Sequence, residues 1–252
     1  MDGAERRSRI LTTLEGRERV GVADLAVELN ASEVTIRKDL DDLAAAGALR
    51  RVRGGAVSAA RRGLTAPFVV REREAYPEKE RIARAAAELI GDGEAVLLDS
   101  GTTGLQTAIA LADHAITLMP LSAREIAALV DAPGVALVLP GGPVRPVELA
   151  FNGAVAERGV AMMRFDTFLL TPCAITAEHG VTAYDVDDAT IKRTGIDAAN
   201  RVIALAEGRK LARTAMAAVC EPGEIDILIT DRDAPVAATD ALVELGIEVV
   251  RV

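Results

Sequence analysis

The sequence predicts two parts: a small helical domain that ends in a β-hairpin, and a larger α/β domain with a mostly parallel sheet and helices on both faces. In the first sixty residues, apolar side chains recur at helical spacing and a short basic hairpin pattern follows. From residue 78 onward, continuously apolar strands alternate with helical segments, which is typical of a parallel sheet covered on both faces. We therefore expect domains at 1–60 and 78–252, with residues 61–77, which contain Gly and Pro, as the linker that leads into the second domain.

The composition excludes several classes of protein. No apolar run reaches the roughly 18 residues of a membrane-spanning helix, and the N-terminal MDGAERRSRI lacks the apolar stretch of a signal peptide, so we expect a cytoplasmic protein with no membrane partner. Cysteine and histidine occur at isolated positions, namely Cys173, Cys220, His114 and His179. This predicts buried, reduced thiols, no metal site, no cofactor and no Ser-His-Asp triad.

The charge is distributed unevenly along the chain. A formal net charge of −9 argues by itself against a nucleic-acid partner. Residues 1–63, however, hold twelve Arg or Lys and ten Asp or Glu, and residues 48–62 hold five arginines and no acid. A local basic patch of this kind suits contact with phosphates, although a solvated surface would give the same pattern.

Three helices and a hairpin are expected in the first domain. Residues 5–15 form the first predicted helix, a second opens at Asp24, and Ser32 is a suitable N-cap for a third at 33–46. Apolar residues of the third helix recur at helical spacing and are expected in the core: Ile36, Leu40 and Leu43. The segment ALRRVRGGAV then predicts a strand, a Gly-Gly turn and a second strand. Together these elements indicate a winged helix-turn-helix.

Polar and basic side chains near the start of the third predicted helix face away from the core: Ser32, Thr35, Arg37 and Lys38. In a helix-turn-helix this part lies in the major groove, where Arg37 would suit guanine and the hydroxyls would suit phosphate or base. Arg51 and Arg53 are expected to project from the hairpin toward the DNA backbone or minor groove. The predicted partner is double-stranded operator DNA.

The second domain alternates helices and strands. Strands are expected at EAVLLD, AITLMP, VALVLP, FDTFLL, RVIALA, DILIT and IEVVRV, and helices at KERIARAAAELI, from about 102, at SAREIAALV, and near 148–157, 187–199 and 236–245. After the first strand, Asp99 and Ser100-Gly101-Thr102-Thr103 lead straight into a helix. Backbone N–H groups and hydroxyls at such a helix start make an anion site, although a capped turn without a ligand would read the same way.

The string ASEVTIRKDLDDLAAAGALRRVRGGA resembles the signature of the DeoR-type family of bacterial repressors. The resemblance implies that Thr35, Arg37 and Lys38 meet DNA and that Ile36 and Leu40 are structural. Where the family usually has a histidine, this chain has Arg53, which keeps the wing basic.

The resemblance continues through the second domain, because DSGTT is similar to the phosphate loop of the DeoR-type sensor, which shares its fold with ribose-5-phosphate isomerase. Other landmarks follow in family order: Pro67-Phe68 with Arg71, Lys79, Gly141-Gly142 with Arg145, Gly153, Asp166, Lys192 and Lys210. This implies a small phosphorylated effector, a sugar or related metabolite, bound by residues among Asp99, Ser100, Gly101, Thr102, Thr103, Gly141, Arg145, Lys192 and Lys210. Independently, the chain has 25 arginines but four lysines, so Lys192 and Lys210 stand out as compact charges suited to phosphate.

Three segments depart from the family pattern: Pro120-Leu121-Ser122, Leu170-Thr171-Pro172-Cys173, and Glu207-Gly208-Arg209. All three segments would line the ligand pocket. The residues expected to bind the phosphate are therefore kept, while those expected to contact the sugar differ from the family. An unusual effector, or a pocket that has lost its ligand, would explain the change.

The sequence therefore predicts a transcriptional regulator, a repressor that acts as a homo-dimer or homo-tetramer, with no catalytic residues. Two alternatives stay open. One is an isomerase-like sugar-phosphate enzyme, for which Asp99 would be the nearest base, since LLTPCAIT contains no acid. The other is a constitutive DNA-binding protein whose second domain only oligomerises.

Overall fold

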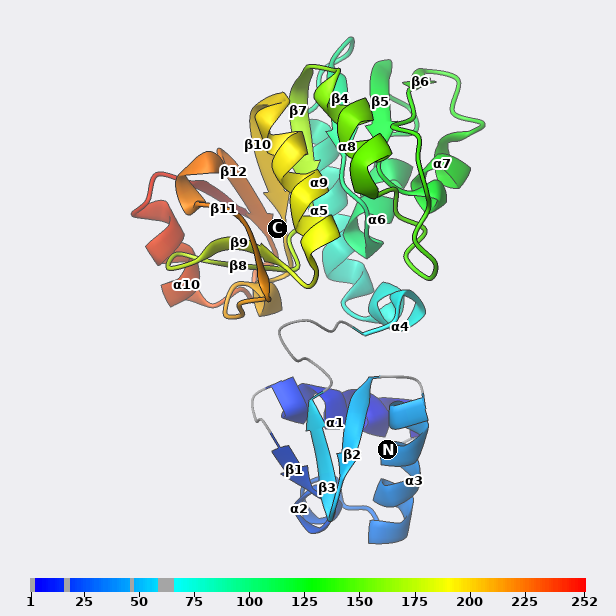
Figure 1. Ribbon diagram of the computed structural model, residues 1–252. Helices are drawn as coiled ribbons and strands as arrows, with labels where there is room; N and C mark the ends of the chain where they lie inside the picture. Colours follow the sequence, from blue (N-terminus) through cyan, green and yellow to red (C-terminus); the bar gives the residue numbers. More distant parts are fainter. Residues whose placement is uncertain (1–2, 16–18, 46–47, 59–65) are drawn as a thin grey trace. The chain divides into compact units, whose positions relative to one another are not determined.

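The computed structural model describes residues 3–15, 19–45, 48–58 and 66–252 (Figure 1). The chain divides into two compact units, Met1–Val70 and Arg71–Val252. Within the part of the chain that is described, no helix is long and apolar enough to cross a membrane.

The first unit is a winged helix. Its helices are α1 (Gly3–Glu15), α2 (Val22–Glu28) and α3 (Glu33–Ala45), and its strands are β1 (Arg19–Gly21), β2 (Leu49–Val52) and β3 (Gly55–Ser58). The strands form an antiparallel sheet in the order β1-β3-β2. The apolar stripes of the helices meet over this sheet, and the predicted core residues Ile36, Leu40 and Leu43 are buried there.

Local contacts explain where these elements begin and pair. Ser32 is confirmed as the residue that caps α3, because its Oγ accepts a hydrogen bond from the Thr35 amide at 3.1 Å. Helix α2 begins at Val22, earlier than the expected Asp24, and strand β1 before it was not predicted. Gly55 lets β3 approach β1 closely, since a Cβ there would lie 2.0 Å from the carbonyl oxygen of Val20.

The second unit, residues 71–252, is built on a seven-stranded parallel sheet, which confirms the predicted α/β class. The strands lie in the order β13-β12-β10-β7-β4-β5-β6. Their bounds are β4 Ala95–Leu98, β5 Ile116–Pro120, β6 Val135–Leu137, β7 Phe165–Leu170, β10 Ala199–Leu205, β12 Ile227–Thr230 and β13 Glu248–Arg251.

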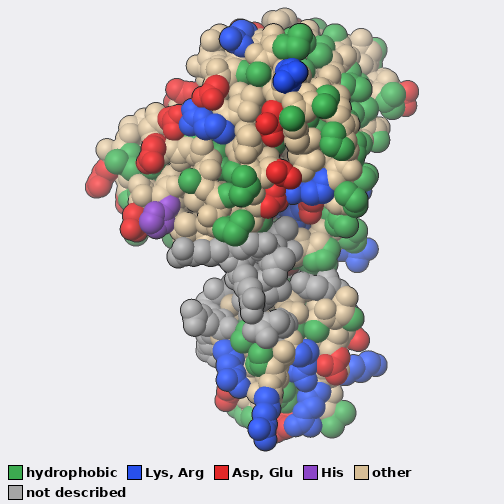
Figure 2. Space-filling view, in the orientation of Figure 1, with side chains coloured by type: hydrophobic (Ala, Val, Ile, Leu, Met, Phe, Trp, Pro, Cys, Tyr) green, Lys and Arg blue, Asp and Glu red, His purple; other side chains and the backbone are tan. Residues whose placement is uncertain are grey.

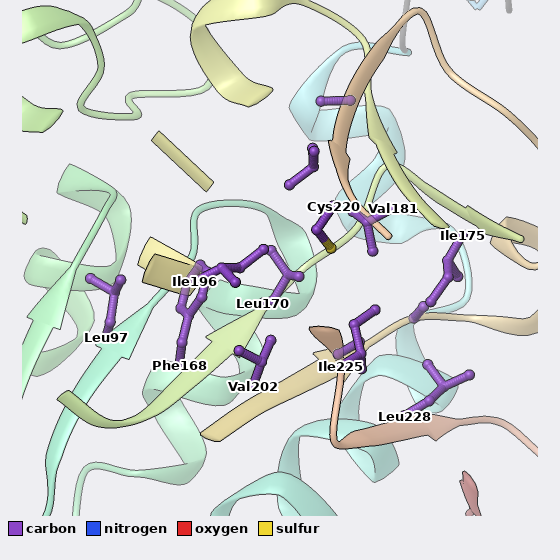
Figure 3. Close-up of a cluster of buried hydrophobic side chains, with 14 of the residues drawn as sticks. Leu97, Phe168, Leu170, Ile175, Val181, Ile196, Val202, Cys220, Ile225 and Leu228 are labelled. Carbon is purple, nitrogen blue, oxygen red and sulfur yellow. The ribbon is translucent and has the colours of Figure 1, made fainter. Parts of the chain in front are cut away.

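Helices cover both faces of this sheet, so its central strands are buried on two sides, while the edge strands β6 and β13 stay partly exposed (Figure 1). Helices α5 (Tyr76–Glu88), α6 (Thr102–Ala110) and α7 (Ala123–Leu129) pack on one face with Val96 and Leu98 of β4. Helices α8 (Gly153–Ala161), α9 (Val186–Asp197) and α10 (Val236–Val243) pack on the other face, where Leu97 and Phe168 point. Figure 3 shows part of this second core, with Leu97 and Phe168 beside Ile196.

A small antiparallel sheet extends the second core and was missed by the sequence analysis. It pairs β8 (Ala174–Thr176), β9 (Gly180–Ala183) and β11 (Ala217–Cys220) in the order β11-β9-β8. Ile175, Val181 and Cys220 from these strands pack against the main core (Figure 3). No helix separates β8 from β9, so this part of the chain lacks the alternation of strand and helix by which the main sheet was recognised.

Two further expectations differ from the structure. Part of the predicted linker is helical, because α4 spans Phe68–Arg73 and α5 begins at Tyr76, while residues 61–65 of that linker lie outside the described residues. The helix expected near 148–157 is α8, which begins only at Gly153. Pro143 and Pro146 precede it in a tight loop, in which Val147 and Leu149 adopt positive φ angles of 73° and 54°. Short 3₁₀ turns, η1 (Gly208–Lys210) and η2 (Pro222–Glu224), complete the unit.

Candidate functional site

The outward face of α3 carries most of the residues predicted to meet DNA. Ser32 and Thr35 are engaged with each other, with their hydroxyl oxygens 2.8 Å apart. Arg37 and Lys38 are exposed, and the Arg37 guanidinium lies 2.7 Å from the carboxylate of Glu33 one turn earlier. Because an exposed ion pair contributes little free energy, it orients Arg37 without removing it from reach of a ligand.

The β2–β3 hairpin is the wing, and its two predicted arginines differ. Arg53 is exposed at the turn. Arg51 does not project as expected, since it donates to Asp41 of α3 and to the Gly55 carbonyl, both at 2.8 Å. It therefore fastens the wing to α3. The sequence analysis missed Arg19, on the unpredicted strand β1, which is exposed and donates to the Arg53 carbonyl at 2.8 Å.

The strand order of the second unit places a topological switch point between β4 and β7. From β4 the chain winds outward through β5 and β6, and from β7 it winds in the opposite direction through β10, β12 and β13. Ligands of open α/β sheets bind at the carboxyl ends of the strands beside such a point. The loop at residues 99–103 follows β4 and Thr171 follows β7, so the predicted phosphate loop lies at this location.

Asp99 joins the two strand ends at the switch point. Its carboxylate is buried, and one oxygen accepts hydrogen bonds from the Thr171 amide at 2.8 Å and the Thr171 hydroxyl at 3.1 Å. The Thr171 hydroxyl also lies 2.6 Å from the Ser100 carbonyl oxygen. Gly101 then turns the chain into α6 with a φ of 131°, a conformation that only glycine adopts readily. Asp99 and Gly101 thus fix the shape of the loop.

The start of α6 has the properties of an anion site. The first N–H groups of a helix lack intrahelical acceptors and carry partial positive charge. The Thr103 hydroxyl oxygen is buried there and has no hydrogen-bond partner among the described residues. Gly104 brings the helix close to the loop, because a Cβ at this position would lie 2.2 Å from the Asp99 carbonyl oxygen and 2.6 Å from Glu125 Oε1.

Lys192 of α9 is the counter-charge of the loop. Its ammonium group is buried, 3.1 Å from Asp99 Oδ1 and 2.6 Å from Asp188 Oδ1. Burial alone would lower the pKa of Lys192, but Asp188 and Asp99 raise it above the ordinary value, so the side chain stays charged. The Cys173 thiol donates to Asp188 at 3.5 Å, and burial, reinforced by Asp188, raises the pKa of this thiol to about 12.

Glu125 of α7 is a buried acid on the other side of the loop. Burial raises its pKa well above the ordinary value, and the neighbouring Asp99 raises it further. The carboxyl is therefore kept neutral beside a carboxylate that Lys192 neutralises. The sequence analysis gave no sign of this residue, because a glutamate near the start of a helix is usually exposed.

Arg145 reaches the start of α9. Its guanidinium lies 2.5 Å from Asp185, which caps α9 by accepting from the Asp188 amide at 2.9 Å. Glu148, three residues later in the same tight loop, pairs with Arg71 of α4. The loop therefore connects the start of α9 to the first helix after the linker. Gly141 lies earlier in this loop, against Val155 of α8.

Lys210 belongs to a second buried cluster, centred on Glu207. The Glu207 carboxylate lies 3.0 Å from Lys210, 3.3 Å from Lys79 and 3.5 Å from Arg209. Burial would raise the pKa of Glu207, but these cations hold it below the ordinary range. Burial lowers the pKa of Lys79 to about 8 despite Glu207. Arg209 also pairs with Glu74, which follows α4, at 2.8 Å.

The structure therefore brings together several of the predicted effector residues. Asp99, the loop up to Thr103, and Lys192 form one contiguous cluster, which Asp185 and Asp188 extend to Arg145. Lys210 contributes to the electrostatic environment of Cys173, as Lys192 does. The sequence analysis placed Thr171 in a pocket-lining segment but did not assign it a role, and it missed three other residues that hold this cluster: Glu125, Asp185 and Asp188. The i, i+4 spacing of Asp188 and Lys192 was the available signal for one of them.

These features combine a winged helix, which is the fold of many DNA-binding domains, with an α/β domain that carries a loop suited to anions at its switch point. Residues 6–62 match the DeoR-like helix-turn-helix domain, and residues 74–232 match the DeoR C terminal sensor domain. The chain belongs to the DeoR family.

Several of its relatives are named as transcriptional repressors. The chain is 33% identical over 255 residues to a protein of Escherichia coli O157:H7 named for transcriptional repression of the aga operon, covering 99% of this chain and 94% of the relative. It is 33% identical over 244 residues to the HTH-type transcriptional repressor GlcR of Bacillus subtilis, covering 97% and 94%. Among solved structures, ribose 5-phosphate isomerase A of Methanocaldococcus jannaschii matches with a TM-score of 0.39 and 13% identity over 52% of each chain.

Proposed function

We propose that this chain is an operator-binding transcriptional repressor whose affinity for DNA is controlled by a small phosphorylated metabolite, a sugar phosphate or a close relative. One observation carries the effector half of the proposal. At the β4–β7 switch point, Asp99 and Thr171 hold a loop that presents the start of α6 and a buried Thr103 hydroxyl with no partner among the described residues. The winged helix and the names of the relatives support the DNA half.

On the DNA side, α3 is the recognition helix. Arg37 reads guanine, Lys38 and Arg19 contact phosphates, and Arg53 at the wing tip contacts the backbone or the minor groove. Ser32 and Thr35 shape the start of the helix through their mutual hydrogen bond and can still accept or donate at the DNA surface. Arg51 acts indirectly, by fixing the wing against α3. We propose that the protein works in the cytoplasm, with two or four copies bound to repeated half-sites.

On the effector side, the phosphate is bound by the first N–H groups of α6 together with the hydroxyls of Ser100, Thr102 and Thr103. A lysine in such a site suggests direct contact with the phosphate, but Lys192 acts indirectly. Its charge neutralises Asp99 and Asp188, which would otherwise repel a phosphate. Glu207 pairs with Lys79, Arg209 and Lys210, and Lys210 is more exposed than Lys79, so Lys210 is the lysine of this cluster that can reach a ligand.

Control of DNA binding starts at Arg145. A phosphorylated ligand competes with Asp185 for this guanidinium, which loosens the loop that also carries Glu148. Glu148 holds Arg71 of α4, and α4 leads back along the chain to the DNA-binding unit. A ligand that favours the loosened arrangement shifts the population away from the DNA-binding state by its difference in affinity for the two states.

The same geometry argues against an enzyme. A general base must reach a proton of the substrate, yet Asp99 is buried and occupied by Thr171 and Lys192. Asp188 is occupied by Lys192 and Cys173. We propose that these acids organise the site rather than transfer protons.

The test is fluorescence anisotropy with the DNA upstream of the gene, at several salt concentrations, with and without a panel of sugar phosphates. We expect specific binding whose log affinity falls with log salt by about 0.9 per phosphate contacted, and release by one member of the panel. If the protein binds this DNA specifically but no compound weakens binding, it is a constitutive DNA-binding protein. If it does not bind this DNA specifically, the repressor proposal is wrong. Turnover of any panel compound, lost in Asp99→Asn, would favour the enzyme.

A further inference from the structure

Val34 stands out on the recognition helix. It is 73% exposed, whereas Ile36, Asp39 and Leu40 of the same helix are buried. A single exposed apolar residue is common on protein surfaces and needs no explanation by itself. Val34, however, is the second residue of α3, within the part of a recognition helix that meets base edges.

The neighbours of Val34 indicate what it faces. Arg37 and Lys38 lie three and four residues later, so they are its neighbours on the helix surface, and both are exposed. On the other side, the Ser32 hydroxyl is turned inward along the chain to cap α3. Val34 is therefore an apolar spot beside Lys38 and the Arg37–Glu33 ion pair, on a polar surface that suits contact with DNA rather than with an apolar protein partner.

The chemistry of the side chain restricts what it can recognise. Valine has no donor or acceptor, so it cannot read any hydrogen-bonding group of a base. In the major groove, the one apolar feature that distinguishes a base is the 5-methyl group of thymine. A β-branched side chain with one strongly preferred rotamer in a helix presents its methyl groups in a fixed direction, which favours a specific contact.

We propose that Val34 is a specificity-determining residue that reads the 5-methyl group of one thymine in each operator half-site. The spacing on the helix also places that thymine. Side chains three residues apart on a helix are about 5–6 Å apart at Cβ, and stacked bases are about 3.4 Å apart. The thymine therefore lies one or two base pairs from the base pair that Arg37 reads. This inference rests on the proposed function, because it requires α3 to enter the major groove.

The experiment removes the methyl group from the DNA and the side chain from the protein in turn. An operator duplex is selected from a random library with the full-length wild-type chain, and each thymine is then replaced singly by deoxyuridine, which lacks only the methyl group. Affinities of the wild type, Val34→Ala and Val27→Ala are measured for each duplex. Val27 is the matched control, since it is 84% exposed but lies on α2.

We expect one thymine in each half-site at which deoxyuridine weakens wild-type binding by about fourfold, the effect of one buried methyl group. Val34→Ala should bind the unmodified operator more weakly and lose all sensitivity at that position, whereas Val27→Ala should respond as the wild type does. Thermal unfolding of both variants should match the wild type, because both side chains are exposed.

The experiment separates failure of the Val34 inference from failure of the proposed function. If the wild type selects no operator, the proposed function fails before Val34 is tested. If it selects an operator but no deoxyuridine effect depends on Val34, the Val34 inference is overturned while DNA binding stands. A deoxyuridine effect that Val27→Ala also abolishes would overturn it as well.

Discussion

The two candidate surfaces use charge in opposite ways. On the winged helix, Arg37, Lys38 and Arg53 are exposed, and the ion pair between Arg37 and Glu33 is in solvent. At the switch point, Lys192 and Asp99 are buried, and an ion pair of 3.1 Å joins the Lys192 ammonium to the Asp99 carboxylate. Figure 2 shows Lys and Arg side chains at the surface of the first unit. Exposed charges are available to a large anionic partner, while buried charges hold the shape of a small site.

Because of this difference, substitutions on the two surfaces should have different effects, one on DNA binding and the other on stability. Removing an exposed charge from the winged helix should change affinity for DNA and leave folding intact. Removing a buried charge from the sensor should first destabilise the domain. The following predictions test that separation, from the largest expected effect to the smallest.

Lys192→Met should lower the free energy of unfolding of the sensor unit by about 3–5 kcal/mol, since it leaves Asp99 and Asp188 buried without their counter-charge. Denaturant unfolding measures the change. Arg193→Ala is the matched control on the next residue, because its ion pairs with Asp197 and Glu224 are at the surface and should cost no more than about 1 kcal/mol. Equal losses for the two variants would contradict the contrast between buried and exposed charge.

Arg37→Ala should reduce discrimination between operator and scrambled DNA by about 1–3 kcal/mol without changing stability. Lys38→Ala, its exposed neighbour, should instead weaken binding to all sequences alike and reduce the salt slope by about one. Anisotropy titrations on both duplexes at several salt concentrations separate the two effects. A similar loss of discrimination in both variants would show that Arg37 does not read a base.

Glu125→Gln should change how stability depends on pH. The folded-state pKa of Glu125 is raised above its ordinary value of 4.5, so its contribution is fully present below pH 4.5 and is lost as pH rises toward the folded-state pKa. The variant should therefore match the wild type in acid and become relatively more stable by up to about 1.4 kcal/mol per pH unit above 4.5. Unfolding measured from pH 4 to 8 tests this, and parallel pH profiles would contradict a neutral buried Glu125.

Thr103→Val should leave the ligand-free sensor as stable as the wild type, or about 1 kcal/mol more stable, because the hydroxyl it removes has no partner among the described residues. The same change should reduce the thermal shift that the effector produces. Thr107→Val is the control: its buried hydroxyl donates to the Thr103 carbonyl at 2.9 Å, so its loss should destabilise the sensor and spare effector binding. The reverse pattern would place the effector elsewhere.

The sequence predicted elements whose signal is local. Apolar spacing identified Ile36, Leu40 and Leu43 as core, and the buried parallel strands followed from their continuous apolar runs. Strand β1 was missed because only Val20 of its three residues is buried, and the β8–β9–β11 sheet was missed because no helix separates β8 from β9. Helix α4 was expected as linker because six residues that contain two valines do not show a helical stripe.

The candidate site likewise has a part that the sequence predicted and a part that it did not. The loop at 99–103 was visible because all its residues are consecutive and follow a strand. Its supports come from distant parts of the chain: Thr171 is 72 residues away from Asp99, and Lys192 is 93 residues away. Only the strand order, with β4 beside β7, brings them together. The direction in which Arg51 points could not be predicted from the sequence either, because it depends on the hydrogen bond to Asp41 of α3.

Reciprocal coupling between the two surfaces is the most direct test of the account. Calorimetry would measure the affinity of the sugar phosphate that releases DNA, once for the free protein and once for the protein saturated with operator. The account predicts that operator weakens effector binding by the same factor by which effector weakens operator binding, because linkage is reciprocal. An effector affinity that is unchanged by operator would contradict control of DNA binding by this site.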